Sequence, residues 1–163
     1  MPRVCNLNQS RGQAPVGRTR AHRHRDRRSI ALVPDAPLKI LVYSDNARTR
    51  DQVRSALGTR VHPDLPELEY LDVATAPVVI ANLDRGGIDL AILDGEASPT
   101  GGLGLAKQLK DEVAHCPPIL VLTGRPDDRW LASWSRAEAA VTHPIDPIEL
   151  GEAVAALLRP STS

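Results

Sequence analysis

Short apolar runs alternate with longer segments of mixed polarity from residue 38 to residue 158. Runs of this length are typical of strands buried on both faces, and the segments between them have the length of helices. Strands that alternate with helices predict βα units and a parallel sheet covered on both sides. The predicted strands are residues 38–44, 67–73, 88–93, 118–123 and 139–142. The predicted helices are residues 47–57, 76–85, 102–114, 127–136 and 146–158.

The third predicted strand is the most informative of these segments. It reads Ile-Asp-Leu-Ala-Ile-Leu from residue 88 and follows the helix-ending pair Gly86-Gly87. Its apolar character predicts a central, buried strand that carries Asp94 at its carboxyl end. We therefore expect Asp94 to lie at the edge of the sheet.

The first 37 residues have a different composition from the rest. They are rich in Arg, Pro, Gly, Ser and Gln, which predicts a disordered extension. Residues 1–36 hold eight arginines and two aspartates, a net charge of +6, so the other 127 residues of this neutral chain carry −6. An acidic body argues against a DNA-binding domain, because phosphate contacts need a basic face. The basic run at residues 18–28 remains open to three interpretations: a solvated charge run, a nucleic-acid or acidic-surface ligand, or a start codon placed too early.

Several protein classes are not supported by the sequence. Cys5 and Cys116 have no paired spacing, so neither a disulfide framework nor a CxxC metal site is expected. No apolar run has the length of a bilayer span, and the amino terminus lacks a secretory signal. We expect a soluble, cytoplasmic protein with one domain at residues 38–159 and a short tail at 160–163. No output domain is expected after the last helix, so its signal would pass through surface contacts.

Polar residues end the predicted strands, where ligands of open parallel sheets gather. The four segments that contain them are Ile-Leu-Val-Tyr-Ser-Asp (40–45), Asp-Leu-Ala-Ile-Leu-Asp (89–94), Val-Leu-Thr-Gly (121–124) and Thr-His-Pro-Ile-Asp-Pro-Ile-Glu-Leu (142–150). In this order and spacing they resemble the receiver domain of bacterial two-component response regulators. The resemblance covers residues 38–158 and implies a flavodoxin-like, doubly wound sheet of order 2-1-3-4-5. The chain resembles an atypical, single-domain member of that family.

The resemblance implies roles for the residues at the strand ends. Asp94 would be the phosphoacceptor, taking a phosphoryl group from a sensor histidine kinase. Mg²⁺ would be held by Asp45, Asp94 and the backbone carbonyl of Glu96, since Mg²⁺ prefers carboxylates, phosphate oxygens and water. Thr123 would be the hydroxyl that reports phosphorylation, although a strand-end threonine can also simply satisfy backbone groups.

Three positions depart from the family pattern. Ser44 replaces the first acidic residue of the metal site, and we expect it to reach a metal ion only through water, with the Glu96 carboxylate as a hypothetical substitute ligand. His143 replaces the family lysine and would be a weaker, pH-dependent partner of the phosphoryl group. Ala140 replaces the usual aromatic switch residue. The His143-Pro144 peptide is expected to keep the cis form.

These departures leave two functional hypotheses. The first is a stand-alone response regulator, a phosphoryl acceptor rather than an enzyme, that signals by docking to a protein effector. The alternative is a phosphorylation-independent pseudo-receiver that acts as a protein-interaction module. A small-molecule binder is not favoured, because the glycines at positions 101, 102 and 104 lack the Lys-Ser/Thr ending of a phosphate loop.

Two tryptophans four residues apart, Trp130 and Trp134, lie on one side of the fourth predicted helix. One interpretation is that they pack into the core or under a loop. The other is that they are exposed anchors for a partner, on the face formed by the fourth helix, fifth strand and fifth helix. Their solvent exposure distinguishes the two.

Overall fold

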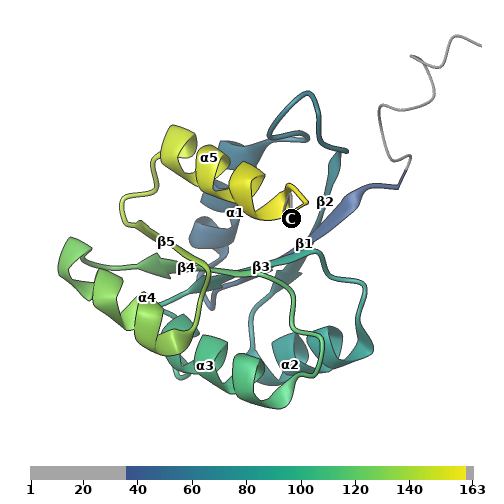
Figure 1. Cartoon of the computed structure of the whole chain (residues 1–163). Coiled ribbons are helices and arrows are strands. Elements are labelled where there is room, and N and C mark those ends of the chain that lie inside the picture. Colours follow the sequence, from purple (N-terminus) through teal and green to yellow (C-terminus); the bar gives the residue numbers. More distant parts are fainter. Residues whose placement is uncertain (1–35, 161–163) are drawn as a thin grey trace, which may run out of the picture. The chain divides into compact units, whose positions relative to one another are not determined.

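Five parallel strands form the centre of the structure, a computed structural model that describes residues 36–160. They are β1 (Leu38–Tyr43), β2 (Leu68–Val73), β3 (Leu90–Asp94), β4 (Ile119–Thr123) and β5 (Ala139–Thr142). The strands pair in the order β2-β1-β3-β4-β5 (Figure 1). This order confirms the predicted flavodoxin-like fold and places β3 in the middle of the sheet.

Helices cover both faces of the sheet, as a parallel sheet requires. They are α1 (Ala47–Leu57), α2 (Ala76–Arg85), α3 (Gly102–Glu112), α4 (Arg129–Ser135) and α5 (Pro147–Leu158). In Figure 1, α1 and α5 lie on one face, and α2, α3 and α4 lie on the other.

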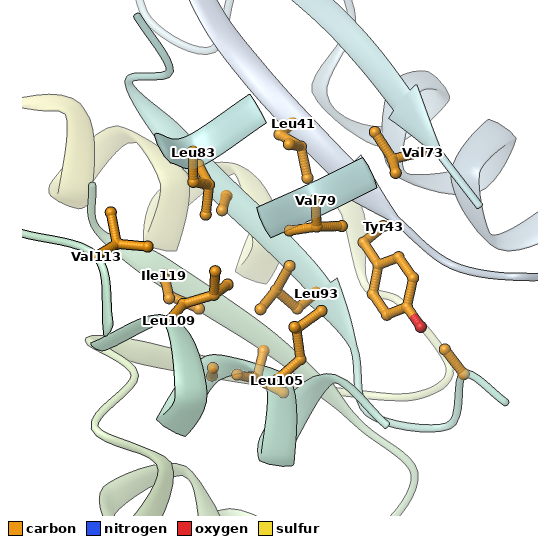
Figure 2. Packing of buried hydrophobic residues seen from close by; sticks show 14 residues of the cluster. Leu41, Tyr43, Val73, Val79, Leu83, Leu93, Leu105, Leu109, Val113 and Ile119 are labelled. Carbon is orange, nitrogen blue, oxygen red and sulfur yellow. The ribbon is translucent and has the colours of Figure 1, made fainter. Parts of the chain in front are cut away.

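Alternate side chains of the strands build two apolar cores, one on each face. In β3, Leu90 and Ile92 pack on the side of α1 and α5, while Ala91 and Leu93 pack on the side of α2 and α3. Figure 2 shows the second of these cores, with Leu93 among side chains of β1, α2 and α3. All four residues are fully buried, which explains why the strand reads as a continuous apolar run.

Two helices that begin beside the carboxyl edge of the sheet have side-chain caps. Asn46 Oδ1 accepts a hydrogen bond from Arg48 N at 3.0 Å at the start of α1. Asp146 Oδ1 accepts bonds from Ile148 N at 2.7 Å and Glu149 N at 3.1 Å at the start of α5. Caps of this kind stabilise a helix by about 1 kcal/mol each. They therefore fix the loops that precede both helices.

The predicted boundaries differ from the structure at a few places. Strand β3 begins at Leu90 rather than at residue 88, and α3 ends at Glu112 because Val113 is extended. The predicted helix at 127–136 is a 3₁₀ turn, Pro126–Asp128, followed by α4, which ends where Arg136 adopts a left-handed conformation. The predictions for the basic extension and Cys5 lie outside the described residues.

Candidate functional site

Residues from four strand ends lie at the carboxyl edge of the sheet. Asp94 is the last residue of β3 and Thr123 the last of β4, while Ser44 and His143 directly follow β1 and β5. Asp94 is only 3% exposed, which is unusual for a carboxylate and requires polar partners. The parallel topology thus brings together the residues that the strand-end pattern singled out.

The Asp94 carboxylate has a different partner on each oxygen. Its Oδ2 accepts a hydrogen bond from Ser44 Oγ at 2.7 Å. Its Oδ1 accepts one from the Glu96 backbone N–H at 3.0 Å and lies 3.6 Å from His143 Nε2. The carboxylate is therefore held in one orientation before any ligand binds.

Ser44 occupies a fully buried position with several fixed partners. Its hydroxyl accepts a hydrogen bond from Asn46 N at 3.0 Å, and its carbonyl oxygen accepts one from Arg50 Nη1 at 2.5 Å. The sequence did not indicate this bond to Asp94. The contact of Ser44 with a metal-bound water stays a prediction. Arg50 was also missed, because nothing in the pattern of α1 distinguishes it from a solvated arginine.

The oxygen groups at this edge suit a hard cation. The Asp45 and Glu96 side chains are exposed, whereas the Asp94 carboxylate is buried. Burial raises the pKa of the Tyr43 phenol, and the negative charges of Asp45 and Asp94 raise it further. Within residues 36–160 no group of three or more His, Cys, Asp or Glu side chains is arranged to hold a metal ion. The donor set fits Mg²⁺, which takes one or two carboxylates and completes its shell with water and phosphate oxygens.

Thr123 has its own hydroxyl partner on the neighbouring strand. The Oγ1 atoms of Thr123 and Thr142 lie 3.2 Å apart, and Thr123 is almost fully buried. The register of β4 and β5 pairs these two threonines, which the sequence pattern did not reveal. The Thr123 hydroxyl is thus bonded to Thr142, while the His143 N–H donates to the Thr123 carbonyl oxygen at 2.8 Å. The predicted cis peptide between His143 and Pro144 is present.

The glycines after β3 are explained by close backbone packing. A Cβ atom at Gly102 would lie 2.6 Å from the Asp94 carbonyl oxygen, and one at Gly95 would lie 2.5 Å from the Leu122 carbonyl oxygen. Both distances are shorter than van der Waals contact, so a side chain at either position would displace the backbone. These glycines allow α3 and the loop between β3 and α3 to lie close to neighbouring backbone. Their presence is explained without a phosphate-binding role.

The two tryptophans of α4 are exposed to solvent. Trp130 is 67% and Trp134 is 52% exposed, so core packing is the wrong interpretation of their spacing. Ile148 at the start of α5 is also exposed. The Lys107 ammonium group lies 5.9 Å from the ring centre of Trp134, which places that indole toward α3. Exposed aromatic residues on one helix are typical of partner contacts.

The order of the strands and the acidic residue at the end of β3 define a receiver-type α/β domain. An uncharacterized response regulatory protein of Mycobacterium tuberculosis, matched in two strains, is 72% identical over 129 residues, which are 78% of this chain and 97% of that protein. Regulatory protein VanR of Enterococcus faecium is 36% identical over 123 residues, which are 74% of this chain and 50% of VanR. The chain therefore belongs to the response regulator family. A comparison with protein-family models finds no match.

Solved structures agree with this assignment. The response regulator TrrA of Thermotoga maritima, in complex with Mg²⁺-BeF, is 26% identical with a TM-score of 0.61, over 74% of this chain and 99% of that chain. A two-component response regulator of Clostridium difficile has a TM-score of 0.63 at 20% identity, over 77% of this chain and 99% of that chain, and shows the fold alone. No helix within residues 36–160 is long and apolar enough to cross a membrane.

Proposed function

We propose that this response regulator accepts a phosphoryl group on Asp94 and passes the signal on by docking to a protein. The observation that supports the proposal most is the Asp94 carboxylate itself, buried at the end of β3 and fixed by bonds to both oxygens. A carboxylate oxygen would attack phosphorus, the bond from phosphorus to the donor atom would break, and the donor would leave with the electron pair. The carboxylate is the attacking species, so no proton has to be removed from it.

Mg²⁺ is the cofactor that the proposed reaction implies. When bound, it neutralises the repulsion between the carboxylate and phosphoryl oxygens. Asp45, Asp94 and the Glu96 carbonyl would hold it, with the exposed Glu96 carboxylate close by against Gly124. Ser44 brings no negative charge, so we propose a weaker metal site than one with an acidic residue at that position.

Thr123 and His143 would respond to the new phosphoryl group. The Thr123 hydroxyl, which lies 3.2 Å from the Thr142 hydroxyl, would turn its proton toward a phosphoryl oxygen. The imidazole of His143, 3.6 Å from Asp94, lies where it would meet the same group. A phosphorylated state would therefore move hydroxyl groups on β4 and β5 that are joined in the structure.

The exposed residues of α4 and α5 support a docking surface for an unidentified effector. Trp130, Trp134 and Ile148 are large apolar side chains that folding leaves exposed. Tryptophan is enriched at the centres of protein interfaces. If the indoles are free in solution, acrylamide should quench most of their fluorescence; strong protection from quenching would contradict this surface.

Phosphorylation is tested by intact mass after incubation with Mg²⁺ and acetyl phosphate. We expect a gain of about 80 Da, the mass of one phosphoryl group, in the wild type and none in Asp94→Asn. Asp89→Asn is the control. Asp89 directly precedes β3, and its carboxylate accepts a hydrogen bond from the Lys39 N–H, away from Asp94. No gain in the wild type at any donor or Mg²⁺ concentration would instead support a pseudo-receiver, the alternative that Ser44, His143 and Ala140 favour.

A further inference from the structure

The Ser44 hydroxyl donates its only proton to another group of the protein. A serine hydroxyl has one proton to donate and two lone pairs to accept with. Its proton is donated to Asp94 Oδ2 at 2.7 Å, and one lone pair accepts from Asn46 N at 3.0 Å. The residue is 0% exposed, so it has no surface on which to meet a metal-bound water.

We infer that Ser44 is a positioning residue for Asp94 and does not serve the metal ion. Its hydroxyl holds Oδ2 on the buried side of the carboxylate. Oδ1 accepts from the Glu96 backbone N–H and lies 3.6 Å from the partly exposed imidazole of His143, so Oδ1 is the oxygen presented to an incoming phosphoryl group. This inference rests on the proposed function of Asp94.

Ser44 is itself clamped on several sides, as a positioning group must be. Arg50 Nη1 donates to its carbonyl oxygen at 2.5 Å, and its own N–H donates to the Val73 carbonyl oxygen at 3.2 Å. Arg50 also lies near Asp72, with 3.8 Å between Nε and Oδ2. The α1 helix and the end of β2 thus hold the backbone that aims the hydroxyl.

Loss of this bond would free the carboxylate to rotate. The torsion that turns an aspartate carboxyl group has broad, shallow minima, so only external contacts fix it. With Oδ2 released, a smaller fraction of molecules would present Oδ1 to phosphorus. In the step itself, Oδ1 forms the new bond to phosphorus, the bond from phosphorus to the acetate oxygen breaks, and acetate leaves with the electron pair.

The test compares Ser44→Ala with Ser135→Ala. Ser135 is the matched control because it is equally buried and its hydroxyl donates to the Ala132 carbonyl oxygen at 2.7 Å, away from Asp94 on α4. Initial rates of phosphorylation by acetyl phosphate are measured by intact mass over a range of Mg²⁺ concentrations. We expect Ser44→Ala to lower the rate at saturating Mg²⁺ about tenfold, because excess Mg²⁺ does not restore the lost orientation of the Asp94 carboxylate. Ser135→Ala should leave this rate unchanged.

Two kinetic outcomes would overturn the inference. A raised half-saturating Mg²⁺ concentration with an unchanged maximal rate would show that Ser44 serves the metal ion. Equal losses of rate in Ser44→Ala and Ser135→Ala would show a general effect of removing a buried hydroxyl.

A second measurement needs no phosphorylation and separates this inference from the proposed function. The ¹³C resonance of the Asp94 carboxyl carbon is recorded in unphosphorylated protein labelled with ¹³C-aspartate and assigned with Asp94→Asn. Ser44→Ala should shift this resonance, and Ser135→Ala should leave it in place. An unshifted resonance in Ser44→Ala would overturn the inference even if Asp94 is phosphorylated, whereas an unphosphorylated wild type would overturn only the proposed function.

Discussion

Replacing Ser44 by aspartate should make folding stability depend on divalent cations. Ser44 Oγ lies 2.7 Å from Asp94 Oδ2, so a carboxylate at position 44 would bring two negative charges within about 4 Å of each other. At an effective dielectric constant of 20, such a pair repels by about 4 kcal/mol. Proton uptake by one carboxyl group relieves part of this repulsion. We therefore expect the free energy of unfolding in a metal chelator to fall by about 2–4 kcal/mol.

Mg²⁺ should reverse this loss. A cation that binds only the folded state at 100 times its dissociation constant adds about 2.7 kcal/mol of stability. The Ser44→Asp variant should gain more from Mg²⁺ than the wild type, because the cation would neutralise the repulsion between the carboxylates at positions 44 and 94.

The assay is urea denaturation at neutral pH with and without Mg²⁺. Ser44→Asn is the control, since it has the same shape as aspartate without the charge. The reasoning would be refuted if Ser44→Asp were as stable as Ser44→Asn in chelator and gained no more from Mg²⁺ than the wild type.

Two further predictions concern the stability of the fold. Gly102→Ala should lower the free energy of unfolding, measured in urea, by about 1–3 kcal/mol, because its Cβ would meet the Asp94 carbonyl oxygen at 2.6 Å. Gly104→Ala is the control. Its Cβ would have no atom within 4 Å, so this substitution should stabilise α3. Burial raises the pKa of Tyr70 to about 12, so its stabilising contribution is complete below the ordinary tyrosine pKa of about 10 and is lost as the pH rises toward 12. Tyr70→Phe should flatten the alkaline fall in thermal stability; an unchanged fall would contradict this assignment.

Much of the fold was predictable because strands buried on both faces leave a strong signal. The apolar run before Asp94 identified β3, and glycines marked the ends of the first two helices. The strand order followed from the family resemblance and not from periodicity. The turn before α4, Pro126–Asp128, was mistaken for part of a helix because it is polar, and apolar spacing carries no information there.

The partners of the site residues were not predictable to the same degree. The approach of Ser44 to Asp94 and of Thr123 to Thr142 depends on strand register and loop conformation, which one sequence does not specify. The exposure of Trp134 was also undecided, because a pair at helical spacing suits both a core and an interface. The residue types at the strand ends indicated the location of the site, and only the structure determined which atoms meet.

The most direct test of the central claim is to locate the phosphoryl group in the protein. After incubation with acetyl phosphate and Mg²⁺, borohydride reduces an aspartyl phosphate to homoserine, and peptide sequencing by mass spectrometry identifies the altered residue. We predict homoserine at position 94 and an unmodified Asp45. Homoserine at another position, or none in protein fully exposed to donor and Mg²⁺, would contradict the assignment of Asp94 as the phosphoacceptor.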